Sequence, residues 1–70
     1  MIRFYRVCVC IDGRYDLVGY YLDPSTASNT ALARARSARA DREYVIVSQI
    51  DVFLNEWITS PLLRVDGLSR

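Results

Sequence analysis

The sequence predicts a small α+β domain, with a three-stranded antiparallel sheet in the order 2-1-3 and one helix packed on one face. Three observations lead to this prediction. Residues 2–11 are rich in β-branched and aromatic side chains and precede Asp12-Gly13, a strong hairpin signal. All six alanines lie between positions 27 and 40, and four of them have helical spacing. A second β-rich run, residues 44–53, follows the helix. The order of elements is therefore ββαβ with a C-terminal tail, in a single domain of residues 1–70.

The first predicted strand, residues 2–11, is largely apolar on both faces, and Arg6 interrupts one of them. This pattern is typical of a central strand that is covered on both sides. The return strand spans residues 14–22, and Gly19 within it favours a β-bulge.

The predicted helix runs from about residue 26 to about residue 40. Asp23, Ser25 and Thr26 are all able to cap its N-terminus. One stripe of the helix comprises Ala27, Ala31, Ala35 and Ala38. Methyl groups let the helix backbone approach a sheet closely, whereas the arginines between them point to the sides and back, where they reach water. We therefore expect Ala35→Arg to unfold the domain.

The third strand, residues 44–53, returns beside the first through a right-handed crossover. Its valines and those of the first strand then meet the alanine stripe. The opposite face carries Phe4, Cys8, Cys10, Ile46 and Ile50. Because one helix cannot cover two faces, this second face needs cover either from the rest of the chain or from another chain.

Residues 54–70 form a tail that either straps the sheet or extends to a partner. The first part has short-helix spacing, shared by Phe53, Leu54, Trp57 and Ile58. Ser60-Pro61 would end that helix. The apolar residues after it form either a last short strand or a strap, and the end is expected to fray.

The composition is that of an ordinary globular protein, with 51% hydrophobic residues, 24% charged residues and a net charge of +1. A protein that coats DNA usually has a large basic excess, which is absent here. No apolar run approaches the roughly 18 residues that a membrane span needs, and the N-terminus lacks a signal-peptide pattern. These features predict a cytoplasmic protein without a membrane partner.

Cys8 and Cys10 are the only cysteines. At about 3.3 Å per residue their Cα atoms would lie about 6.5 Å apart, so a disulfide between them would be strained. Without a third cysteine or a histidine, one chain cannot close a four-ligand zinc site. The pair is best explained as buried small side chains, with redox activity or a metal shared between two chains as alternatives.

Catalytic motifs are missing from the sequence. It contains no histidine and no lysine, and its three glycines are far apart, which excludes the common triads, lysine nucleophiles and phosphate-binding loops. Asp12 and Asp16 are better explained by turn chemistry than by acid–base catalysis. We therefore expect a protein that is not an enzyme and has no cofactor and no metal.

Three binding hypotheses follow. A protein-binding module is favoured, since arginine, tyrosine and tryptophan are enriched at contact patches. The candidate partner-binding residues are Arg34, Arg36, Arg39, Tyr15, Tyr20, Tyr21 and Trp57. Nucleic-acid binding uses the same residue types, but residues 24–50 carry a net charge of only +2, from four arginines and two acids. A homo-oligomeric structural protein, such as a dimer, is the third hypothesis.

In size and order of elements the chain resembles the small orphan proteins of phages and mobile elements. The resemblance is carried by the hairpin IRFYRVCVCIDGRYDLVGYY, the small-residue helix STASNTALARARSA and the returning strand YVIVSQIDVF. That group includes anti-CRISPR proteins and phage inhibitors of host transcription. The resemblance implies a short, cytoplasmic, non-catalytic protein that blocks a site on a larger host complex. It is architectural, so it assigns no functional residue.

Overall fold

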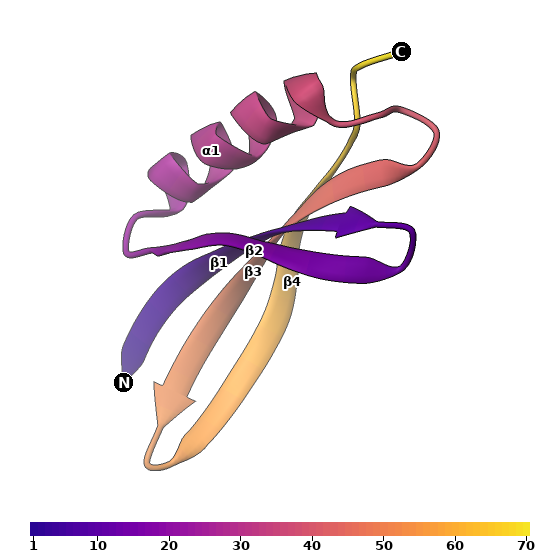
Figure 1. Cartoon of the computed structure of the whole chain (residues 1–70). Coiled ribbons are helices and arrows are strands. Elements are labelled where there is room, and N and C mark those ends of the chain that lie inside the picture. The colour runs from indigo at the N-terminus through magenta and orange to yellow at the C-terminus, as the bar shows by residue number, and fades with distance from the viewer.

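The computed structural model describes all 70 residues and contains four strands and one helix (Figure 1). The elements are β1 (Ile2–Ile11), β2 (Arg14–Tyr21), α1 (Pro24–Ser37), β3 (Glu43–Phe53) and β4 (Glu56–Asp66). The strands form one antiparallel sheet in the order β2-β1-β3-β4. The α+β class is therefore confirmed, but the predicted three-stranded ββαβ sheet is wrong. A fourth strand extends the sheet beyond β3.

The fourth strand exists because the chain reverses directly after β3. Leu54 and Asn55 both have positive φ angles, 34° and 76°, and form a two-residue turn between β3 and β4. Neither residue is a glycine, so this turn lacks the usual sequence signal. Pro61 lies within β4, at the sheet edge where proline is tolerated. The expected helix near residues 53–58 does not form, and no tail crosses the sheet. Of the two alternatives for the apolar residues after Pro61, the strand is the one observed, as part of the longer β4.

The β1–β2 hairpin has the predicted turn. Asp12 and Gly13 have φ angles of 50° and 83°, the left-handed values that a type I′ turn needs at both positions. The register shifts opposite Val7 and Cys8, where β2 contributes one extra residue next to Gly19. The predicted bulge is therefore present, and it adds twist to the edge strand.

Helix α1 begins at Pro24 and is capped by Asp23, whose carboxylate accepts a hydrogen bond from the Thr26 backbone N–H at 3.0 Å. The helix ends at Ser37, a few residues before the expected end. The alanine stripe faces the sheet as predicted: Ala27, Ala31 and Ala35 have no exposed surface.

The core is one layer between α1 and the sheet. Four valines, Val7, Val9, Val45 and Val47, meet the alanine stripe, and Tyr5 extends the layer. Three of these valines have no exposed surface. The predicted pairing of the alanine stripe with the valines of β1 and β3 is confirmed. The side chains at the alternate positions of β1 and β3 consequently point away from the helix.

The C-terminal segment after β4 is bonded to the end of α1. The backbone N–H of Leu68 donates to the carbonyl oxygen of Ala35, and that of Ser69 donates to Ala38. Gly67 makes this approach possible, because a Cβ at this position would clash with the carbonyl oxygens of Ala38 and Arg39. The expected fraying of the end is therefore wrong.

Candidate functional site

The sheet face opposite α1 carries no other element of the chain, and we call it the open face (Figure 1). Its centre consists of alternate residues of β1 and β3, which pair across the sheet. They are Phe4, Arg6, Cys8 and Cys10 on β1, and Tyr44, Ile46, Ser48 and Ile50 on β3. The edge strands add side chains on either side, so all four strands contribute to this surface.

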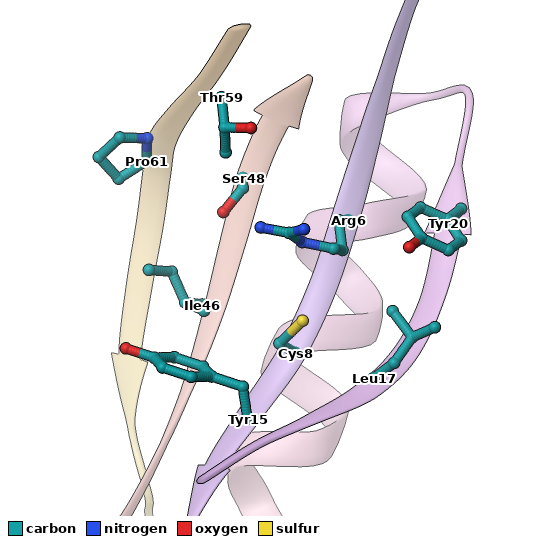
Figure 2. Close-up of a pocket in the computed structure, with 9 residues that line it drawn as sticks. All are labelled: Arg6, Cys8, Tyr15, Leu17, Tyr20, Ile46, Ser48, Thr59 and Pro61. Atoms are coloured by element: carbon teal, nitrogen blue, oxygen red, sulfur yellow. The ribbon is translucent and has the colours of Figure 1, made fainter. Parts of the chain in front are cut away.

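A hollow of about 550 Å³ lies in the middle of the open face. Figure 2 looks onto it with α1 behind the strands. The floor comes from the two central strands, and the walls come from β2 and β4. The lining residues are Arg6, Cys8, Tyr15, Leu17, Tyr20, Ile46, Ser48, Thr59 and Pro61. None of them is acidic, and more than half are apolar or aromatic.

Arg6 is the one charged side chain of the hollow. Figure 2 shows it extending from β1 toward Ser48 of β3. Its Nε atom is buried and has no hydrogen-bond partner. The three salt bridges of the chain join other residues, the arginines being Arg3, Arg42 and Arg64. A buried donor without an acceptor is costly, and more so in a charged group, so the Nε donor of Arg6 is left unsatisfied in the free chain.

An aromatic cluster borders one end of the hollow. The Phe4 ring makes edge-to-face contacts with Tyr20 of β2 and Trp57 of β4, at centroid distances of 5.6 and 5.7 Å. Phe4 thereby joins the two edge strands across the sheet. Tyr20 and Trp57 are nevertheless 56% and 67% exposed. Large rings held in place by neighbours but open to water are suited to contact with another molecule.

A second polar cluster borders the other end. The hydroxyl groups of Tyr15 and Tyr44 lie 3.1 Å apart and share a hydrogen bond. The guanidinium of Arg64 lies 3.9 Å above the Tyr44 ring, a cation–π contact. Hydrogen bonds with Cys10 and then with Tyr15, together with burial, raise the pKa of Tyr44 above its usual value. Tyr44 is therefore a neutral phenol at physiological pH.

Both cysteines lie on the open face, where they are buried and form no disulfide. This confirms their interpretation as buried small side chains. Larger neighbours on the edge strands cover them, because Cys8 pairs with Leu17 and Cys10 with Tyr15 across β1 and β2. No group of three or more histidine, cysteine or acidic residues lies close enough together to hold a metal ion. No helix is long and apolar enough to cross a membrane.

The structure divides the seven predicted partner-binding residues between the two sides of the molecule. Tyr15, Tyr20 and Trp57 belong to the open face. Tyr21 packs against the helix-side core and is partly buried. Arg34 and Arg36 are exposed on α1, and Arg39 follows the helix. The arginines and the three aromatic residues therefore do not form one surface.

Sequence reasoning missed Arg6 as a site residue, although the signal was present. An arginine interrupts the apolar face of a strand that is otherwise predicted to be central, and charged residues are rarely buried unless they are paired. Leu17, Ser48, Thr59 and Pro61 were also missed. The last two reach the hollow only because β4 joins the sheet, so their placement required the fourth strand.

The chain matches no protein-family model, no curated protein and no solved structure. Functional conclusions therefore depend on the residues of the open face.

Proposed function

We propose that this chain is a non-enzymatic protein-binding module that docks through the open face and blocks a site on a larger complex. One observation carries the proposal: exposed aromatic and aliphatic side chains surround an unpaired arginine on a sheet face that no part of the chain covers. Tyrosine, tryptophan and arginine dominate the binding energy of many protein interfaces. The open face presents all three residue types.

The size of the open face fits a protein interface. The two longer dimensions of the molecule are 44 and 24 Å, which bound a face on the order of 1,000 Å². A specific protein complex typically buries about 800 Å² on each partner. Leu17, at 55% exposed, is one of several large apolar side chains whose remaining surface would be removed from water on docking.

The charge distribution favours a protein over a nucleic acid. The basic side chains of the open face are Arg6 and Arg64, and Arg64 already contacts Asp66 at 3.1 Å. Non-specific nucleic-acid affinity comes from several lysines or arginines that neutralise phosphates together. Arg34 and Arg36 lie on α1, on the other side of the sheet. They therefore cannot contact a nucleic-acid strand that is bound to the exposed rings of the open face.

The proposed mode of action is occupation of a partner's surface. A module of this kind needs shape and charge complementarity rather than reactive groups. This mode agrees with the resemblance to small phage proteins, which implies inhibition of a larger assembly in the cytoplasm. Under this proposal the exposed arginines of α1 remain in solvent or form secondary contacts at the edge of the interface.

Site-specific photo-crosslinking tests the proposal. A photoreactive residue is placed at Leu17 on the open face, or at Leu32, which is exposed on α1 and serves as the matched control. We expect a discrete protein crosslink from position 17 in cells of the source organism, and none from position 32. The crosslinked protein is then purified, and its affinity for the double variant Leu17→Ser, Tyr20→Ser should fall, whereas Arg36→Ala should bind like the parent.

The alternatives give different results in the same experiment. Crosslinking of position 17 to RNA or DNA would support the nucleic-acid hypothesis instead. Crosslinking to a second copy of the chain would indicate a homo-oligomer. Equal crosslinking from positions 17 and 32 would contradict docking through the open face.

A further inference from the structure

We propose that Arg6 receives one side-chain carboxylate, an aspartate or glutamate of the protein partner, inserted into the hollow of the open face. This inference is based on the proposed function and names the chemistry that the partner brings to the site.

The first argument is the state of the guanidinium. Arginine presents five N–H donors in a rigid planar fork that matches a carboxylate. The Nε donor of Arg6 has no acceptor within the chain, and none of the nine lining residues is acidic. The chain therefore holds a cation at the bottom of a hollow without supplying its counter-charge. Any partner that covers the hollow removes the remaining water from this cation, which makes a counter-charge necessary.

The second argument is the lining of the hollow. Leu17 and Pro61 provide apolar walls, Ile46 is part of the floor, and the hydroxyl groups of Ser48 and Thr59 line the same space. A carboxylate at the end of an aliphatic side chain fits this combination, because its methylene groups contact the apolar wall while its oxygens meet the guanidinium and hydroxyl donors. A phosphodiester lacks the aliphatic part, and the one other arginine of the face is already paired.

The third argument excludes a second copy of this chain as the occupant. A two-fold symmetric complex places the same surface on both sides of the interface. Face-to-face docking of two copies would therefore bring the two Arg6 side chains together near the symmetry axis. Asp66, which pairs with Tyr44 at the end of this face, is the last residue of β4 and contacts Arg64. The self-complex consequently lacks a carboxylate at its centre.

Selection from a displayed random peptide library tests the inference without a known partner. The parent protein is the bait, and selected peptides are synthesised in pairs that differ by Glu→Gln or Asp→Asn at the enriched position. We expect acidic residues to be enriched at one position. The amide version should bind at least about twentyfold more weakly, as is typical when one member of a buried charge pair is removed.

Matched variants of the bait connect this effect to Arg6. Arg6→Met should lose the preference for acid over amide, and Arg6→Lys should retain only part of it, because lysine lacks the planar fork. Arg36→Met removes an arginine from the exposed side of α1 and should behave like the parent. Circular dichroism establishes that each variant is folded. NMR gives a readout that does not depend on variants. The Nε–H resonance of Arg6 in the parent protein should shift when the acidic peptide binds, and it should not shift when the amide version of the peptide is added.

The outcomes separate this inference from the proposed function. If peptides bind the open face, so that Leu17→Ser and Tyr20→Ser weaken them, but show no acidic preference and do not respond to Arg6→Met, the carboxylate inference is overturned and the proposed function stands. If the selected peptides are indifferent to all open-face variants, or none is selected, both are overturned. An unchanged Arg6 Nε–H resonance also overturns the carboxylate inference.

Discussion

Replacing Arg6 by methionine should stabilise the free protein. Methionine keeps an unbranched stem of similar length on β1 and removes the guanidinium, which has a buried Nε donor without a partner. The residues that line the hollow together with Arg6 include the apolar Cys8, Leu17 and Ile46, and a flexible thioether adapts to such surroundings. The substitution therefore removes an unfavourable group without opening a cavity.

The magnitude follows from the cost of an unsatisfied donor. A buried polar group without a partner costs about 1–3 kcal/mol. Arg6 is only partly buried, so the lower end of this range applies, and we expect a gain of about 1 kcal/mol in the free energy of unfolding. For a domain of this size such a gain raises the melting temperature by roughly 4–8 °C.

Urea and thermal unfolding, followed by circular dichroism, measure this gain. Both are repeated at two protein concentrations, because an apolar face without its charge could dimerise and gain stability from association. The control is Arg36→Met on the exposed side of α1, which should change stability by less than about 0.5 kcal/mol. A loss of about 1 kcal/mol or more in Arg6→Met would refute the reasoning, since Arg6 would then make favourable contacts within its own chain.

Three further predictions concern the fold. Ala35→Arg should abolish the cooperative thermal transition, because Ala35 has no exposed surface and overpacking combined with a buried charge exceeds the small stability of such a domain; a parent-like melting curve would show that the helix orientation is wrong. Gly67→Ala should lose about 1–3 kcal/mol in urea unfolding and reduce the hydrogen-exchange protection of Leu68 and Ser69, because the added Cβ clashes with backbone carbonyls. Asp51→Asn tests a pH effect. The hydrogen bond and charge of Arg3, 2.7 Å away, hold the pKa of Asp51 below its usual value. The stabilisation is therefore present above the unfolded-state pKa of about 3.9 and disappears as the pH falls through the lower folded-state pKa. The difference in urea midpoint between parent and variant should shrink on acidification, and a constant difference would contradict the assignment.

The elements with local and redundant signals could be predicted from the sequence. Asp12-Gly13 fixes the first turn because few dipeptides adopt positive φ at both positions. The alanine stripe determines which side of α1 faces the sheet, since each member of the stripe lacks the bulk to keep the backbones apart. The valines of β1 and β3 then have only one helix face to meet. Local pattern and tertiary packing agree in these elements.

The start and length of the fourth strand could not be predicted, although a last short strand was one alternative for its second half, because its turn contradicts local preference. Leu54 adopts a positive φ and is 98% exposed, an unfavourable position for a large apolar residue. The pairing of β4 with β3 through ten residue pairs compensates for this local cost. This compensation comes from contacts between two strands, so it is not visible in a short stretch of sequence. Pro61 misleads in the same way, because it is unfavourable in a central strand but tolerated at an edge.

The candidate site was predicted in part, and the missing part has a specific cause. Tyr15, Tyr20 and Trp57 were identified as contact residues from residue type alone, and they do lie on the open face. The helix arginines were identified in the same way, but α1 carries them to the other side of the sheet. Arg6 was treated as an interruption of an apolar pattern. The role of Arg6 depends on which side chains surround it on the three other strands, and these neighbours are known only once the sheet register is known.

We expect Arg6 to let the open face bind a partner while opposing its association with a second copy of the chain. A surface built only of apolar and aromatic side chains invites association with a second copy of the chain. A guanidinium at the centre of the face opposes this, because a two-fold complex would bury two like charges against each other, at a cost of several kcal/mol. A partner that brings a carboxylate avoids this repulsion and gains a charge-assisted pair. If the proposed function holds, the residue that we expect to lower the stability of the free chain would also discriminate between partners, so stability and specificity would be opposed at a single position.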